Sequence, residues 1–148
     1  MEQNGSKLLK VISILMIIGG ILGAILSLVS IAGAGLLSAA SGDAQLQQAA
    51  TEAGTNMGAV NALVWVSVVF MVISSVIEIV AGVKGVKNWS NPAAAKSLFT
   101  IGVVCAVISV IGTIISAIGG SFSVVSLILG LLFPVLYIIG ANQLKKQG

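Results

Sequence analysis

The sequence contains no histidine and no arginine, only one cysteine, and few charges of either sign. The single Cys105 excludes an intrachain disulfide and a metal site built from a cysteine cluster. The chain also lacks a nucleophile–base pair and a glycine-rich phosphate loop, which are the usual signatures of catalytic sites. We therefore expect a non-enzymatic protein that holds no metal and no cofactor.

Charge is scarce enough to decide the class of protein. Charged residues make up 7% of the chain, against about 25% in a typical soluble domain. Hydrophobic residues make up 57%, and the mean hydropathy is +1.16. The lysines lie in short clusters beside apolar segments, where they meet lipid headgroups, and no basic patch with interleaved aromatic residues indicates nucleic acid. The composition predicts an integral membrane protein whose first partner is the lipid bilayer.

Four apolar runs are each long enough for the ~20 residues with which a helix crosses a bilayer. They cover about 11–37, 58–83, 98–118 and 122–143. Lys7 and Lys10 precede the first run, as in a signal peptide, but that run exceeds the ~7–15 apolar residues of such a segment, which favours a true span. We predict an all-α membrane protein with one domain over residues 1–148, in which four transmembrane helices form an up-down-up-down bundle.

In each half of the chain one break separates the two spans, a polar segment in the first half and a glycine-rich turn in the second. Adjacent glycines at Gly119 and Gly120, followed by Ser121, predict a tight turn in the last uncharged stretch. Residues 41–56 form the one long polar segment, predicted to lie outside the membrane. Asp43 or Ser41 can cap a helix over 44–53, which Gly54 would end. The alternatives are a plain loop or a continuation of the first helix.

The lysines also predict the orientation. With four spans, all seven lysines fall on one side, and the other side receives Asp43 and Glu52. Because cytoplasmic loops carry the excess of lysine, both termini and the 84–96 joint are predicted to be cytoplasmic, in the plasma membrane. The expected anchors at this surface are Lys84, Lys87, Trp89 and Lys96. Asn91 and Pro92 predict a turn that starts the third span.

The same joint carries a resemblance. Gly82 to Trp89 reads GVKGVKNW, and Asn91, Pro92 and Lys96 follow. This pattern resembles small four-span membrane proteins of Gram-positive bacteria, in which a glycine- and lysine-bearing helix end precedes an Asn-Pro turn and a third span. The resemblance implies a bacterial four-span protein and carries over no functional residues.

Glu78 is the candidate for chemistry, because it is the one charge inside an apolar run. A charged side chain at a helix centre costs roughly 2.5–3.5 kcal/mol on insertion scales, so such residues often mark an ion or proton path. On a helix, Ser67, Ser74, Ser75 and Glu78 share a polar face. Aligning the two halves places Tyr137 at the depth of Glu78, and we predict a hydrogen bond between them. Two roles for Glu78 stay open, a structural residue held by such a pair and part of a transport site.

Small residues recur at spacings of about four in two spans. Gly19, Gly23 and Ser27 lie on the first, and Gly102 and Ala106 on the third. Such spacing lets helix backbones approach closely in a membrane. The contacts can lie within one bundle or form an oligomer interface.

These features leave three functions open. The leading prediction is a non-enzymatic structural or interaction protein of the membrane, either self-associating as a homo-oligomer or an accessory subunit of other membrane proteins. The first alternative is a small channel or transporter that uses Glu78 and the serine face of the second span. The second is an immunity-type membrane protein, which protects a bacterium from a membrane-active toxin.

Overall fold

A computed structural model describes residues 3–118 and 123–147 of the chain. Within these residues the structure is helical apart from short connections, which confirms the predicted all-α class. The predicted turn at 119–121 lies outside the described residues. In chain order the helices are α1 (Gln3–Ala40), α2 (Ala44–Glu52), α3 (Met57–Asn88), the 3₁₀ helix η1 (Pro92–Ala94), α4 (Ala95–Ile118) and α5 (Val124–Lys145).

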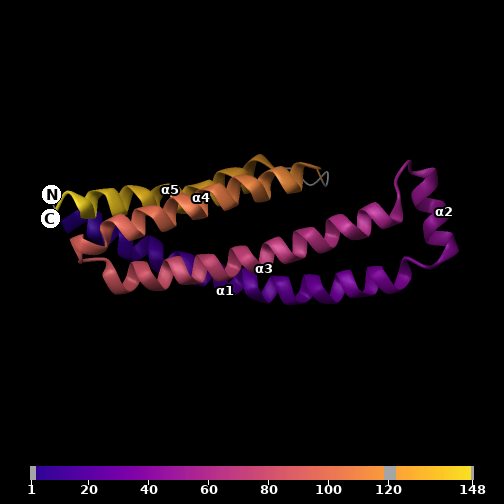
Figure 1. The fold of residues 1–148 in the computed structure, drawn as a ribbon, viewed down its shortest axis with the longest axis horizontal. Coiled ribbons are helices and arrows are strands. Elements are labelled where there is room, and N and C mark those ends of the chain that lie inside the picture. The colour runs from indigo at the N-terminus through magenta and orange to yellow at the C-terminus, as the bar shows by residue number, and fades with distance from the viewer. Residues whose placement is uncertain (1–2, 119–122, 148) are drawn as a thin grey trace.

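Four of these helices are long and apolar enough to cross a membrane, so the chain is an integral membrane protein with four spans. The 38 residues of α1 and the 32 of α3 extend about 57 and 48 Å at 1.5 Å per residue. The 24 residues of α4 and the 22 of α5 extend only about 36 and 33 Å. The hairpin of α1 and α3 therefore reaches well beyond the hairpin of α4 and α5, toward α2 (Figure 1).

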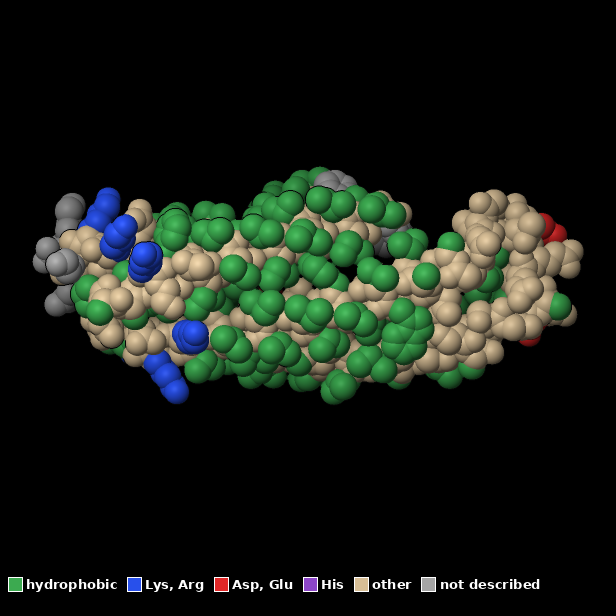
Figure 2. Space-filling view, in the orientation of Figure 1, with side chains coloured by type: hydrophobic (Ala, Val, Ile, Leu, Met, Phe, Trp, Pro, Cys, Tyr) green, Lys and Arg blue, Asp and Glu red, His purple; other side chains and the backbone are tan. Residues whose placement is uncertain are grey.

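The four long helices form the predicted up-down-up-down bundle. Helix α1 packs along α3, α3 along α4, α4 along α5, and α5 returns to pack against α1. The second and fourth spans are therefore diagonal across the bundle. Both chain ends lie at the same end of the molecule (Figure 1), which also carries the lysine side chains visible in Figure 2. The acidic side chains visible in that view lie at the opposite end, near α2.

The buried core lies toward the lysine-bearing end. Tyr137 of α5 is fully buried, and its ring lies between two glycines. A Cβ atom on Gly85 of α3 would come within 2.9 Å of the ring, and one on Gly102 of α4 within 3.0 Å. Residues of all four long helices pack around it: Leu9, Ile12, Met16, Ala81, Ala95, Leu98, Cys105, Ala141 and Leu144. This half of the bundle is closed by side-chain packing.

Glycines bring α1 and α3 into backbone contact. A Cβ atom on Gly82 would lie 2.6 Å from Ile17 Cγ1 and 2.7 Å from the carbonyl oxygen of Ser13. A Cβ atom on Gly20 would meet Ile79 in the same way, at 2.6 Å from Cγ1 and 3.1 Å from the backbone nitrogen. The two helices can lie this close because neither glycine carries a side chain.

Capping residues define the connections. The Asp43 side chain accepts a hydrogen bond from the backbone N–H of Gln45 at 2.9 Å, and Gly54 follows α2 with a φ of 72° that favours glycine. The predicted helix in the 41–56 segment is thus confirmed. The Asn91 side chain likewise accepts from Ala93 at 3.1 Å and starts η1. The predicted helix start at the Asn91–Pro92 pair is also confirmed.

Candidate intramembrane binding cleft

A cleft of about 480 Å³ lies between α3, α4 and α5, in the half of the bundle away from the packed core. It exists because the two hairpins separate beyond that core (Figure 1), and Figure 2 shows a hollow between them. We call it the outer cleft, after the end of the molecule that carries α2. Its polar lining comprises Ser67, Ser74 and Glu78 of α3, Cys105, Ser109, Thr113 and Ser116 of α4, and Ser123, which directly precedes α5.

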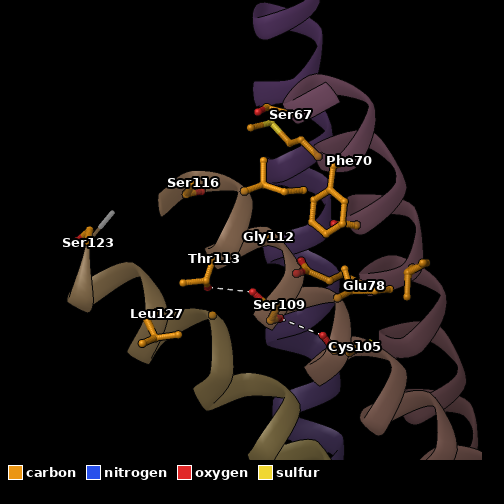
Figure 3. A pocket seen from close by; sticks show the side chains of 16 residues that line it. Ser67, Phe70, Glu78, Cys105, Ser109, Gly112, Thr113, Ser116, Ser123 and Leu127 are labelled. Carbon is orange, nitrogen blue, oxygen red and sulfur yellow. Dashed lines mark hydrogen bonds between the residues drawn. The ribbon is translucent and has the colours of Figure 1, made fainter. Parts of the chain in front are cut away.

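Glu78 lies at the inner end of the outer cleft, close to the core residue Cys105. Its side chain is half-buried and extends from α3 toward α4 (Figure 3). The carboxylate also lies beside the backbone of α1, since a Cβ atom on Gly19 would be 3.8 Å from Glu78 Oε2. Among the described residues no hydrogen-bond donor and no lysine pairs with this carboxylate.

Hydroxyl groups line the walls above Glu78. Ser67, Ser109 and Thr113 each donate to the carbonyl oxygen four residues earlier, at 2.8, 3.0 and 2.9 Å. Serine and threonine in helices commonly bond in this way, and their oxygens can still accept a hydrogen bond. The Ser74 hydroxyl is buried and has no partner among the described residues. A buried hydroxyl without a partner costs about 1–3 kcal/mol.

Apolar side chains complete the outer cleft. Phe70 of α3 projects toward α4, where a Cβ atom on Gly112 would lie 2.9 Å from its ring. The other apolar side chains of the lining are Met71 and Ile77 of α3, Ile108 and Ile115 of α4, and Leu127 of α5. The combination of a few polar groups with a largely apolar lining is typical of sites for small molecules.

The structure divides the polar face that the sequence predicts. Ser67, Ser74 and Glu78 line the outer cleft, whereas Ser75 faces α1. The Ser75 hydroxyl donates to the carbonyl oxygen of Met71 at 2.8 Å and lies 2.7 Å from the Cβ position of Gly23. Neighbouring residues of a helix point about 100° apart, so Ser74 and Ser75 meet different partners.

The predicted hydrogen bond between Tyr137 and Glu78 is wrong. The Tyr137 hydroxyl donates instead to the carbonyl oxygen of Ala81, at 2.9 Å. Tyr137 does lie on the helix diagonal to Glu78, but it packs within the closed core and not in the outer cleft. A phenol has a single hydrogen to donate, and a backbone carbonyl of α3 takes it.

Three of the predicted small-residue positions lie in contacts between helices of the chain. Gly23 faces Ser75, Gly19 faces Glu78, and Gly102 packs against Ile138, whose Cγ1 would be 2.8 Å from an added Cβ. Ser27 is buried and donates to the carbonyl oxygen of Ala24 at 2.7 Å, and Ala106 is half-buried on α4. Four further glycines lie in close contacts that were not predicted: Gly20, Gly82, Gly85 and Gly140.

The α4 wall of the outer cleft was also not predicted. Ser109, Thr113 and Ser116 recur at three- and four-residue spacing on one face, and none of them was among the predicted site residues. If these hydroxyls are taken as a polar face of α4, that face is expected to lie opposite the polar face of α3, which Ser67, Ser74 and Glu78 form. Hydroxyl spacing was therefore the available signal.

Aromatic residues connect α1 to α3 near both ends. The predicted anchors Lys84, Lys87 and Lys96 lie in the 84–96 joint between α3 and α4. In the same joint, the amine of Lys10 lies over the Trp89 ring, 4.8 Å from the ring centroid. Such a cation over an indole face is attractive. Near α2, the Trp65 indole N–H donates to Ser38 Oγ at 2.9 Å, and Ser38 Oγ lies 2.9 Å from Asn61 Oδ1.

No protein-family model, curated protein or solved structure matches the chain. The resemblance to small four-span proteins of Gram-positive bacteria therefore stays a prediction from the Gly82–Lys96 residues. What the fold supports is the four spans themselves.

Proposed function

We propose that this protein is a non-enzymatic membrane interaction protein that binds an amphipathic molecule in the outer cleft. The observation that carries the proposal is the cleft itself, which joins a polar inner end to apolar walls. Its volume of about 480 Å³ falls within the ~300–1,000 Å³ of sites for small ligands. The hydroxyl oxygens of Ser109 and Thr113 in its lining can still accept hydrogen bonds.

The lysine distribution supports a proposal for the orientation of the bundle in the membrane. Both termini and the joint between α3 and α4 face the cytoplasm, so the outer cleft opens on the opposite side of a plasma membrane. The closed core, with Tyr137 at its centre, lies toward the cytoplasm. The fold then consists of a packed inner half and a binding outer half.

A role in self-association is supported less well than binding. The small residues that would have formed an oligomer interface, including Gly23 and Gly102, already contact other helices of the same chain. An accessory role toward another membrane protein is compatible with the outer cleft, because a bound molecule can be passed to a neighbour.

The second candidate is a small transporter that uses Glu78. A carboxylate inside a span, at the inner end of a cleft, favours this function. The packed side chains around Tyr137 separate Glu78 from the lysine-bearing end. Transport would therefore require that core to open, and flux across proteoliposomes that stops in Glu78→Gln would establish it.

The binding proposal is tested by a fluorescent reporter at the mouth of the outer cleft. An environment-sensitive dye is attached to Ser116→Cys in a Cys105→Ser background, and the protein is reconstituted in lipid nanodiscs. Decanol, decyltrimethylammonium and decyl sulfate are titrated separately, so that one chain is compared with three headgroups. We expect a saturable change in emission with at least one of them.

Two matched glycine variants serve as controls. A Cβ atom has open space within 4 Å at both Gly130, which lines the outer cleft, and Gly33, which does not. Gly130→Leu should remove the saturable signal by filling the cleft, and Gly33→Leu should leave it unchanged. A response that is linear in amphiphile and equal in both variants would mean that the dye senses only the bilayer.

A further inference from the structure

Glu78 lacks a compensating charge inside the bundle. The lysines flank the helix ends, and the one closest along α3 is Lys84, six residues and about 9 Å further on. None of the described lysines forms a salt bridge with the carboxylate. A carboxylate away from water is costly unless a positive charge and hydrogen-bond donors accompany it. A cation bound in the outer cleft would supply that charge.

The remaining polar atoms of the outer cleft select for the same charge. Ser109 and Thr113 direct their hydroxyl hydrogens at backbone carbonyls, so they present oxygen lone pairs to the cleft. No lysine belongs to the described lining. An anion would be repelled by Glu78 and would find no cation, whereas a positively charged group meets a carboxylate and several hydroxyl oxygens.

Size and apolar lining indicate an organic cation. A bare Ca²⁺ or Mg²⁺ ion binds six or more oxygens at about 2.0–2.6 Å, and the outer cleft is far larger than such a cage and carries one carboxylate. Phe70 and Ile108 offer an apolar wall, and the face of an aromatic ring attracts an ammonium group. A single carboxylate balances a single positive charge.

We propose that the outer cleft binds a monovalent organic cation, an ammonium group with an apolar body, with Glu78 as its counter-ion. The inference rests on the proposed binding function and specifies its ligand class. The ammonium group lies between Glu78 and the Ser109 hydroxyl, and the apolar body extends past Phe70 toward the mouth. The amine of a lipid headgroup and a free amphipathic amine share this chemistry.

The test uses the dye at residue 116 and the three decyl amphiphiles described above. The labelled protein with wild-type Glu78 should bind decyltrimethylammonium more tightly than decanol, and it should bind decyl sulfate least tightly. Glu78→Gln keeps the side-chain shape but removes the charge. It should lower the affinity for the cation at least about tenfold, as loss of a buried charge partner does, and leave the affinity for decanol unchanged.

The outcomes separate the two proposals. Binding of decanol that equals or exceeds that of the cation would overturn the cation inference and leave the binding function standing. Saturable binding of none of the three would overturn both. The ranking of the three headgroups needs no variant, so the inference stays testable if Glu78→Gln fails to fold.

A change of bilayer identifies the source of the amine. Nanodiscs of phosphatidylglycerol alone are compared with nanodiscs that also contain phosphatidylethanolamine. A weaker apparent affinity for decyltrimethylammonium in the second bilayer, with decanol unaffected, supports a lipid amine as the occupant. Equal affinity in both bilayers supports a free amine.

Discussion

Replacing Gly82 by alanine tests the contact between α1 and α3. The added Cβ atom would lie 2.6 Å from Ile17 Cγ1, 2.7 Å from the Ser13 carbonyl oxygen and 3.0 Å from the Ile17 nitrogen. Ordinary van der Waals contact begins at 3.4 Å, so the α1 backbone must withdraw by a large part of an ångström. Overpacking of this kind typically costs about 1–3 kcal/mol of unfolding free energy.

Gly33→Ala provides the matched control for this change. It makes the same substitution on α1, where an added Cβ meets no atom within 4 Å. Alanine is the better helix former by about 1 kcal/mol, so this variant should be neutral or slightly more stable. Gly20→Ala should resemble Gly82→Ala. The double variant should lose less than the sum, because one withdrawal of α1 relieves both clashes.

Unfolding by sodium dodecyl sulfate in mixed micelles measures these differences, with fluorescence of Trp65 and Trp89 as the readout. We expect the Gly82→Ala and Gly20→Ala midpoints to shift to lower denaturant and the Gly33→Ala midpoint to stay or rise. Equal shifts for Gly82→Ala and Gly33→Ala would refute the backbone contact between α1 and α3.

Two further predictions concern the core and the orientation. Tyr137→Phe should lower the unfolding free energy by only ~0.6 kcal/mol, the average for a membrane hydrogen bond. Tyr137→Ala should lower it by about 3–5 kcal/mol, because it leaves a cavity. Equal losses in a denaturation assay would assign the role of Tyr137 to its hydroxyl. In a Cys105→Ser background, an impermeant maleimide added outside whole cells should label Gln48→Cys and not Ser90→Cys, and the reverse pattern would contradict the cytoplasmic termini.

The sequence predicts the spans well because membrane crossing depends on length and apolar content alone. A helix of about 20 apolar residues has few alternatives in a bilayer, so the 11–37 and 58–83 runs became α1 and α3. The α2 cap was also predictable, because Asp43 bonds to the backbone two residues further on and needs no distant partner.

Contacts between spans were less predictable. Apolar helices present small and polar residues on several faces, and the sequence does not state which neighbour each face meets. Gly19 and Gly20 differ by one position, yet Gly20 makes the close backbone contact and Gly19 leaves room for Glu78. Tyr137 bonds to a backbone carbonyl, which every residue offers, so residue types alone did not identify Ala81 as its partner.

The outer cleft depends on a feature that no local pattern reports. It forms because two hairpins of unequal length pack together at the lysine-bearing end and separate beyond it (Figure 1). The separation makes Ser109 and Thr113 part of a cleft wall.

The most direct test of the account is the accessibility of two matched cysteines. Ser109→Cys lines the outer cleft, and Ser75→Cys faces α1, although both serines donate to the carbonyl four residues earlier. In a Cys105→Ser background, a small cationic methanethiosulfonate is added to proteoliposomes from either side. The account predicts that Ser109→Cys reacts only from the α2 side and that Ser75→Cys reacts from neither side. Equal reaction at both positions, or faster reaction of Ser109→Cys from the lysine-bearing side, would contradict a cleft that is open outward and closed inward.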